Sequence, residues 1–115
     1  MRHIISGAVL AAILICGSAL AAPPSVQVQG SVPTSSGGFQ TVGLNVAFAD
    51  LDISSGSGAA TLLQRIDSAA RVVCKPINSS VSWSARQFES CRKNAVSEAV
   101  EAVGSPALTQ ATAAQ

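Results

Sequence analysis

The spacing of hydrophobic residues changes along the chain, and each spacing predicts a different kind of segment. From Ile4 to Leu20 the residues are apolar or small, and none is charged. From Val42 to Phe48 apolar residues occupy every second position, which predicts a strand with one buried face. Beyond Gly58 they recur at the spacings of one helix face, which predicts helices.

Residues 1–21 have the pattern of a cleaved signal peptide. Arg2 supplies a positive charge, a short apolar run follows, and Ala19-Leu20-Ala21 places small residues where signal peptidase reads the chain. We expect cleavage before Ala22 and export to the periplasm or beyond the cell, with a mature form that does not span the membrane.

A membrane anchor and a lipid attachment site are the alternatives to cleavage of this segment. A membrane anchor is disfavoured because the apolar run is short for a span and is followed by Pro23-Pro24 without a charge cluster. Lipidation of Cys16 is disfavoured because Ile15, rather than a small residue, precedes it.

Residues 22–38 are rich in Pro, Ser, Gly and Gln, and we expect a mobile N-terminal segment. Val26, Val28 and Val32 are its apolar anchors. A strand over residues 26–32 would form a hairpin with the strand at 42–48, and the sequence leaves open whether it does. Two strands alone are marginal in water, so their apolar face needs a cover.

A first helix is predicted after the breaker Ser54-Ser55-Gly56-Ser57-Gly58. Pro76 disfavours helix at Lys75, so the end is expected near Cys74. The helix face consists of apolar residues three and four apart: Ala59, Leu62, Leu63, Ile66, Ala70 and Val73.

A second helix is predicted to begin at a capping box formed by Ser84 and Gln87. Gly104 suits the position just past its end, and Pro106 is expected to prevent the helix from resuming. The domain is expected over residues 39–108, with a fraying tail at 109–115. The apolar stripe of this helix consists of Phe88, Cys91, Ala95, Ala99 and Ala102.

Cys74 and Cys91 are the only cysteines that remain after cleavage. In an oxidising compartment such a pair is expected to form a disulfide, and a zinc site would need further thiols or imidazoles. The predicted fold is therefore α+β and mainly helical: an N-terminal strand or β-hairpin packed on a disulfide-linked antiparallel helical hairpin.

Charge and residue content exclude several classes of function. Cleavage leaves six basic and six acidic residues, so the net charge is zero and there is no electrostatic footprint for nucleic acid or anionic lipid. The single histidine, His3, leaves with the signal, and the chain has no tyrosine. Neither Lys75 nor Lys93 stands in an S-x-x-K arrangement that would activate a serine. We predict no catalytic residues and no cofactor.

Asp50 and Asp52 are the candidate metal ligands. Two side chains two apart on an extended segment point the same way and suit a hard cation. Two carboxylates are nevertheless too few for a cation cage. They would equally serve as hydrogen-bond acceptors at the strand end, complement the first helix dipole, or pair with Arg65 or Arg71.

Three further motifs have ordinary and functional interpretations. Gly56-Ser57-Gly58 precedes a helix, as a phosphate cradle does, but lacks the P-loop lysine. Asn78-Ser79-Ser80 matches a glycosylation acceptor, which matters only in a eukaryotic secretory pathway. Trp83 is expected to act as a hydrophobic staple or a lid on the disulfide, with ligand stacking as the alternative.

The chain resembles the UrcA family of small exported bacterial proteins. The resemblance covers about Val42 to Leu108 and rests first on Phe48-Ala49-Asp50-Leu51-Asp52-Ile53. It continues with Leu62, Arg65-Ile66, Ala69-Ala70 and Val73-Cys74, and later with Cys91, Ala95, Ala99-Val100, Val103 and Ser105-Pro106-Ala107-Leu108. Phe48 departs from the tyrosine expected there, which weakens any role that needs a phenol.

The resemblance implies a Gram-negative source and a periplasmic location, and it brings no activity with it. From these observations we predict a non-enzymatic structural or interaction module of the cell envelope, whose partner is a cell-envelope protein. The alternative is a metal-binding or metal-stress protein that uses Asp50 and Asp52.

Overall fold

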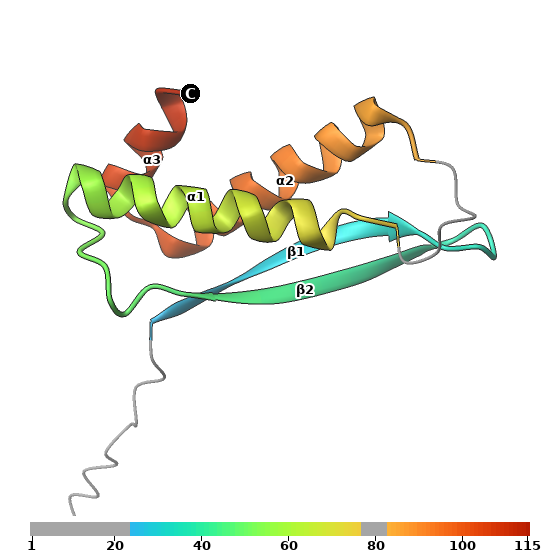
Figure 1. Ribbon diagram of the computed structural model, residues 1–115, viewed down its shortest axis with the longest axis horizontal. Coiled ribbons are helices and arrows are strands. Elements are labelled where there is room, and N and C mark those ends of the chain that lie inside the picture. The colour runs from blue at the N-terminus through green and yellow to red at the C-terminus, as the bar shows by residue number, and fades with distance from the viewer. Residues whose placement is uncertain (1–23, 77–82) are drawn as a thin grey trace, which may run out of the picture.

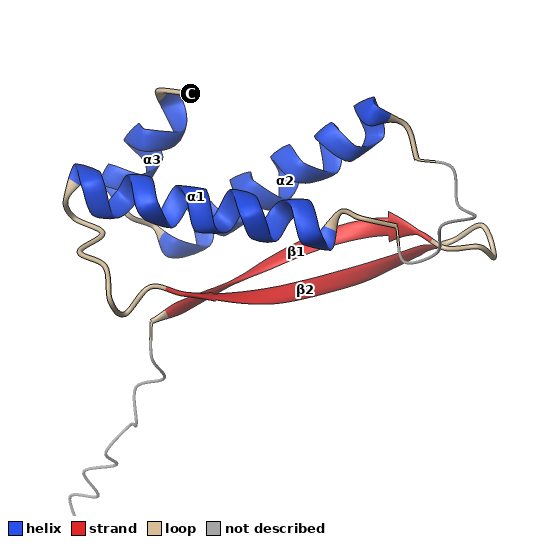
Figure 2. Cartoon of the chain, in the orientation of Figure 1, coloured by secondary structure: helices blue, strands red, loops and turns tan. Residues whose placement is uncertain are grey.

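The structure is a computed structural model that describes residues 24–76 and 83–115. The expected signal peptide, Cys16 and the Asn78 motif lie outside these residues. The described chain forms two strands followed by three helices, with the helices on one side of the strand pair (Figure 1, Figure 2). The elements are β1 (Ser25–Pro33), β2 (Phe39–Ala47), α1 (Gly56–Val73), α2 (Ala85–Val103) and α3 (Pro106–Ala113). The predicted α+β class is confirmed.

The strand that the sequence left open forms as β1. It pairs with β2 in antiparallel register over nine residues, from Ser25 opposite Ala47 to Pro33 opposite Phe39. The expectation of a mobile segment over residues 22–38 is wrong for 25–33, because every second residue of β1 is buried under the helices. These buried residues are Val26, Val28, Gly30 and Val32.

Close packing of α1 on β1 explains why position 30 is a glycine. A Cβ atom at this position would lie 2.8 Å from the backbone oxygen of Val73, at the end of α1. The absence of a side chain therefore lets α1 approach the backbone of β1 directly.

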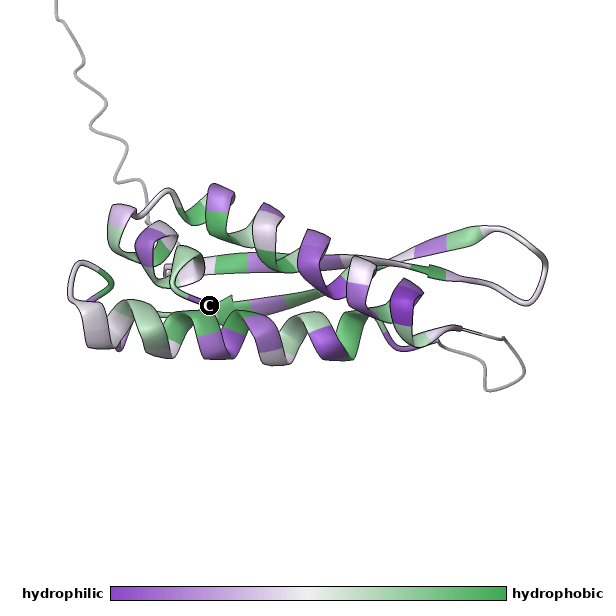
Figure 3. Cartoon of the chain, turned by 90° about the horizontal axis from the view of Figure 1, so that it is seen from above, coloured by the Kyte–Doolittle hydropathy of each residue, from purple (hydrophilic) through white to green (hydrophobic). Residues whose placement is uncertain are grey.

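β2 is more exposed than its alternating sequence predicts. Val46 is buried and Val42 is half-buried, but Leu44 is 41% exposed. The reason is the placement of the helices: α2 packs against β1 and does not reach β2, so α1 alone covers β2. Figure 3 shows both long helices from above, with the strand pair beneath them.

The two long helices begin and end as their capping residues predict. Ser55 accepts a hydrogen bond from the Gly58 N–H at 3.0 Å, so α1 begins inside the segment expected to be a breaker. Ser84 and Gln87 form the predicted capping box of α2, and Gly104 ends this helix with φ of 68°. The helices run in opposite directions (Figure 1), which confirms the antiparallel hairpin.

The tail is helical, contrary to expectation. Pro106 does not prevent a helix from resuming; it occupies the first turn of α3, where a missing N–H costs nothing. Ser105 caps this helix and donates a hydrogen bond to the carbonyl of Ile53 at 3.1 Å. Leu108 is completely buried among the core residues, so α3 is docked on the fold and extends to Ala113.

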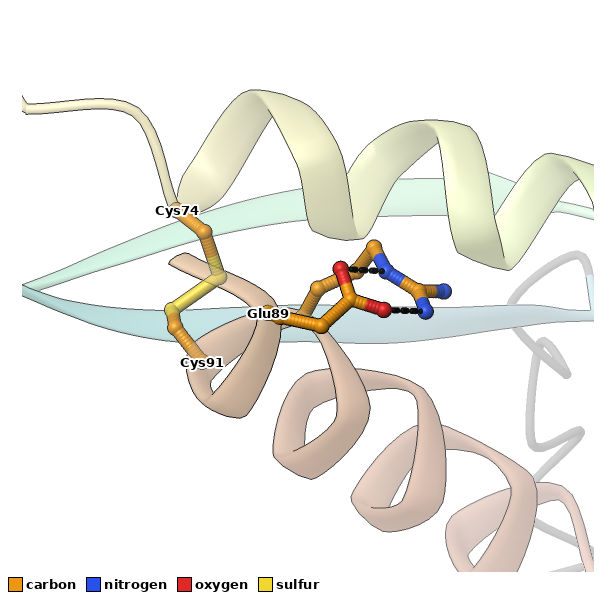
Figure 4. The surroundings of a disulfide bond; sticks show 4 residues. Cys74, Glu89 and Cys91 are labelled. Atoms are coloured by element: carbon orange, nitrogen blue, oxygen red, sulfur yellow. Dashed lines mark hydrogen bonds and ion pairs between the residues drawn. A yellow bond between two sulfur atoms is a disulfide. The ribbon is translucent and has the colours of Figure 1, made fainter. Parts of the chain in front are cut away.

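The disulfide is formed as predicted. Cys74 caps α1, Cys91 lies in α2, and their Cα atoms are 5.9 Å apart with a sequence separation of 17. Figure 4 shows the bridge joining the end of α1 to the first half of α2. Cys74 is completely buried, so the bridge is also part of the core.

Loss of this bridge is expected to lower the free energy of unfolding by about 2–5 kcal/mol, as is typical for a small secreted domain. The variant is Cys74→Ala/Cys91→Ala, which leaves no lone thiol, and urea denaturation measures the change. Wild-type protein denatured without reductant should contain no titratable thiol from Cys74 or Cys91. Two titratable thiols in freshly purified protein would contradict the bridge.

Truncation of Leu108 tests whether α3 is docked. Leu108→Ala is expected to cost about 2–5 kcal/mol because it leaves a cavity in the core. Gln110→Ala changes an exposed position of the same helix and should leave the denaturation midpoint nearly unchanged. Equal midpoints for the two variants would show that α3 does not contribute to the core.

Candidate functional site

The loop between β2 and α1 brings Asp50 to Arg65 rather than to Asp52. Both oxygens of the Asp50 carboxylate accept hydrogen bonds from the Arg65 guanidinium, at 2.8 and 2.7 Å. The same guanidinium donates to the backbone oxygen of Ala47 at 3.0 Å. The hydrogen bonds from Arg65 to the carboxylate hold the pKa of Asp50 at about 2, below its ordinary value of 3.8. Asp50 thus fastens the end of β2 to α1.

Asp52 closes the turn that leads into α1. Its carboxylate accepts hydrogen bonds from the hydroxyl and the backbone N–H of Ser54, which lower the pKa of Asp52. Its backbone oxygen accepts from the N–H and the hydroxyl of Ser55, the cap of α1. Gly58 completes the turn, because a Cβ there would lie 1.9 Å from the Asp52 carbonyl oxygen.

The arrangement favours a structural role for both aspartates. Asp50 takes the ion pair with Arg65 that the sequence offered as an alternative, whereas Arg71 pairs with Asp67 at 3.0 Å. Among the described residues, no group of three or more His, Cys, Asp or Glu side chains is placed to hold a metal ion. The Gly56-Ser57-Gly58 motif also has a structural use, since the Gly58 N–H is bonded to Ser55.

An ion-pair network that sequence reasoning missed joins the two long helices. Asp67 of α1 pairs with Arg92 of α2. Arg92 pairs in turn with Glu89 (Figure 4). The hydrogen bonds that Arg92 donates to Glu89 lower the pKa of Glu89, and those that it donates to Glu89 and Asp67 raise the pKa of Arg92. The three-residue spacing of Glu89 and Arg92 was the available signal, but nothing in the sequence identifies Asp67 as the partner across the helices.

A groove lies between the first half of α2 and the strand hairpin, and we name it the α2 groove. Its volume is about 490 Å³. Trp83 and Cys91 of the disulfide both line it, and the Trp83 indole N–H is buried without a hydrogen-bond partner among the described residues. Phe39, 70% exposed, lies on the hairpin side. The polar lining includes Gln29, Thr41, Gln87, Ser90, Asn94 and Glu98.

The α2 groove offers amides, hydroxyls and two aromatic rings, with Glu98 as its one charged side chain. Amides and hydroxyls bind neutral polar groups through hydrogen bonds, and aromatic rings add stacking area. Of its lining residues, the sequence singled out Trp83 as a candidate for ligand stacking. The hairpin residues could not be placed beside α2 without knowing that β1 forms.

Within the described residues no helix has the length and apolar character needed to cross a membrane. Comparison with known proteins adds no further constraint: no protein-family model, no curated protein and no solved structure matches this chain.

Acid titration tests the structural role of Asp50. Its folded pKa lies below the unfolded value, so its contribution to stability is present above about pH 4 and is lost as the pH falls toward 2. Asp50→Asn should therefore melt below the wild type at pH 5, and the difference should vanish near pH 2. Thermal unfolding followed by circular dichroism measures this difference at each pH.

Glu101→Gln is the matched control, because Glu101 is exposed and forms no ion pair with any described residue. Its melting temperature should stay close to that of the wild type at pH 5. A difference for Asp50→Asn that persists undiminished at pH 2 would rule out the ion pair as its cause.

Proposed function

We propose that the protein is a non-enzymatic interaction module of the bacterial cell envelope, exported by a cleaved signal peptide. The observation that carries this proposal is the α2 groove, whose lining is suited to binding. Its side chains are amides, hydroxyls and aromatic rings at the surface of a cross-linked scaffold.

The chemistry of the groove also defines the partner that we propose. With Glu98 as the one charged side chain, the groove matches a neutral polar segment of a cell-envelope protein better than a phosphate or a cationic peptide. Trp83, which lines the groove, offers the partner an aromatic ring for stacking. Trp83 would then contact the ligand as well as cover the disulfide.

Three observations support the cellular location. The disulfide requires an oxidising compartment to form and persist. The charge run, apolar core and Ala19-Leu20-Ala21 site have the pattern of a signal peptide. The resemblance to the UrcA family, which extends over about Val42 to Leu108, is the third and implies the periplasm.

Site-specific photo-crosslinking in cells tests the proposal. A benzophenone amino acid at Asn94, which lines the α2 groove, should give discrete adducts with an envelope protein in the periplasmic fraction. The same residue at Ser97 is the matched control, since Ser97 is exposed on α2 and is not part of the groove. Adducts from Asn94 that are absent with Ser97 support binding in the groove.

The opposite patterns would count against it. The same adducts from both positions would show unspecific contact along α2, and no adduct from Asn94 would remove the α2 groove as the binding surface.

A further inference from the structure

The outer edge of β2 presents backbone groups that the fold does not use. Phe48 N–H bonds to the Pro24 oxygen at one end of the hairpin, and Thr34 N–H bonds to the Gly38 oxygen at the other. Hydrogen-bonded pairs alternate along an antiparallel ladder, so the even-numbered residues of β2 bond to β1. The odd-numbered residues therefore direct their N–H and C=O groups away from β1.

These outward groups form a short free edge. Among the described residues, none bonds to the outward backbone groups of Thr41, Gly43 or Asn45. The edge ends at Ala47, whose oxygen accepts a hydrogen bond from Arg65. Edge strands are commonly protected by proline or by charged side chains. Residues 39–47 contain neither, so β2 is open to pairing.

A groove beside this edge has a volume of about 540 Å³, and we name it the β2 groove. The end of β2 forms one wall, with Leu44 and Val46, and one face of α1 forms the other, with Ala69 and Val72. Leu44 and Val72 are 41% and 54% exposed, which is unusual for large apolar side chains. Leu44 lies on the side of the hairpin that faces the helices, as Val42 and Val46 do.

The charge of the β2 groove restricts what fits it. Arg65 is its one charged lining residue, and the ion pair with Asp50 neutralises Arg65. The remaining polar lining consists of hydroxyls and amides from Asn45, Thr61, Gln64 and Ser68. The occupant that matches this surface is uncharged over the part that lies in the groove.

We propose that the β2 groove binds an extended, uncharged peptide segment, which adds to the hairpin as a third strand. Its main chain bonds to Thr41, Gly43 and Asn45, and its side chains alternate in direction. Those opposite Leu44 and Val46 enter the β2 groove beneath α1 and are apolar, whereas those opposite Thr41 and Gly43 face solvent. The ligand class is therefore a strand with apolar residues at every second position.

A second copy of the protein fits this edge less well. Antiparallel pairing of two β2 strands places a two-fold axis beside β2 and brings both α1 helices onto the same face of the sheet. Because α1 already walls the space beyond β2, the second α1 would compete for it. A lone extended segment has no such helix. This site is separate from the α2 groove and does not depend on it.

The test uses the full protein purified from the periplasm with its disulfide intact. The probe is a fluorescent nine-residue peptide with the sequence of residues 39–47, which is uncharged and alternates as required. Fluorescence anisotropy should show saturable binding. N-methylation of the peptide amides on one edge should abolish binding, and methylation of the alternate amides should leave it unchanged, because one edge alone can pair with β2.

Variants of the protein locate the site. Asn45→Pro removes one outward N–H without touching the ladder to β1, and it should weaken binding about tenfold or more, whereas Asn45→Ala keeps the N–H and should bind like the wild type. Val72→Lys places a charge in the β2 groove and should also abolish binding. Ala60→Lys is its matched control, at an exposed position of α1 outside the groove.

Edge-selective loss on methylation, together with loss in Asn45→Pro and Val72→Lys only, supports the proposal. Absence of saturable binding at millimolar peptide overturns it. Binding that is insensitive to Val72→Lys overturns it as well, because the peptide would then lie elsewhere. A dimer of the wild type in sedimentation analysis that Asn45→Pro dissociates would assign the edge to a second copy instead.

Discussion

The bridge between Cys74 and Cys91 determines how α2 lies on the rest of the fold. The buried residues of α2 are Ala95, Val96, Ala99 and Val100, all in its second half. In the first half Phe88 is only partly buried against the core, and the disulfide and the pairing of Arg92 with Asp67 add to its hold on this half. This half therefore lies beside the hairpin without being buried against it, and the α2 groove stays open between them.

Small residues allow the rest of the structure to pack closely. Ala59, Ala70 and Ala99 are almost completely buried, and Gly30 lets the end of α1 approach the backbone of β1. A core rich in alanine and valine, with four larger side chains (Leu62, Leu63, Ile66 and Leu108), has little apolar area per residue, so the free energy gained by burial is modest. Two features compensate for this modest gain: the disulfide limits the unfolded state, and Arg65 fastens the exposed end of β2 to α1.

Local signals predicted the helical part of the fold well. The hydroxyl cap at Ser84 with Gln87, the glycine at 104 and the spacing of apolar residues all act within one or two turns, so the sequence contains them directly. The disulfide was equally accessible, because the expected cleavage before Ala22 leaves only one possible pair of cysteines. The ion pair of Asp50 with Arg65 was one of the alternatives that the sequence offered, beside pairing with Arg71, and local spacing could not decide between them.

The parts that could not be predicted depend on contacts between distant segments. β1 is polar at alternate positions and rich in breakers at its ends, and it becomes a strand because α1 and α2 bury its valines. Pro106 was interpreted as a stop, yet it begins α3 because Leu108 finds a place in the core. The exposure of Leu44 is also nonlocal: it follows from α2 lying over β1 only.

The distribution of charge connects these structural features with recognition. Of the twelve charged residues from residue 24 onward, six are engaged in ion pairs with one another: Asp50, Arg65, Asp67, Arg71, Glu89 and Arg92. They hold elements together and add little net field for steering a charged ligand. Both grooves are consequently lined by amides, hydroxyls and apolar groups, with a single charged side chain each. Recognition at such surfaces depends on hydrogen bonds and shape, which suits uncharged polypeptide better than an ion or a nucleic acid.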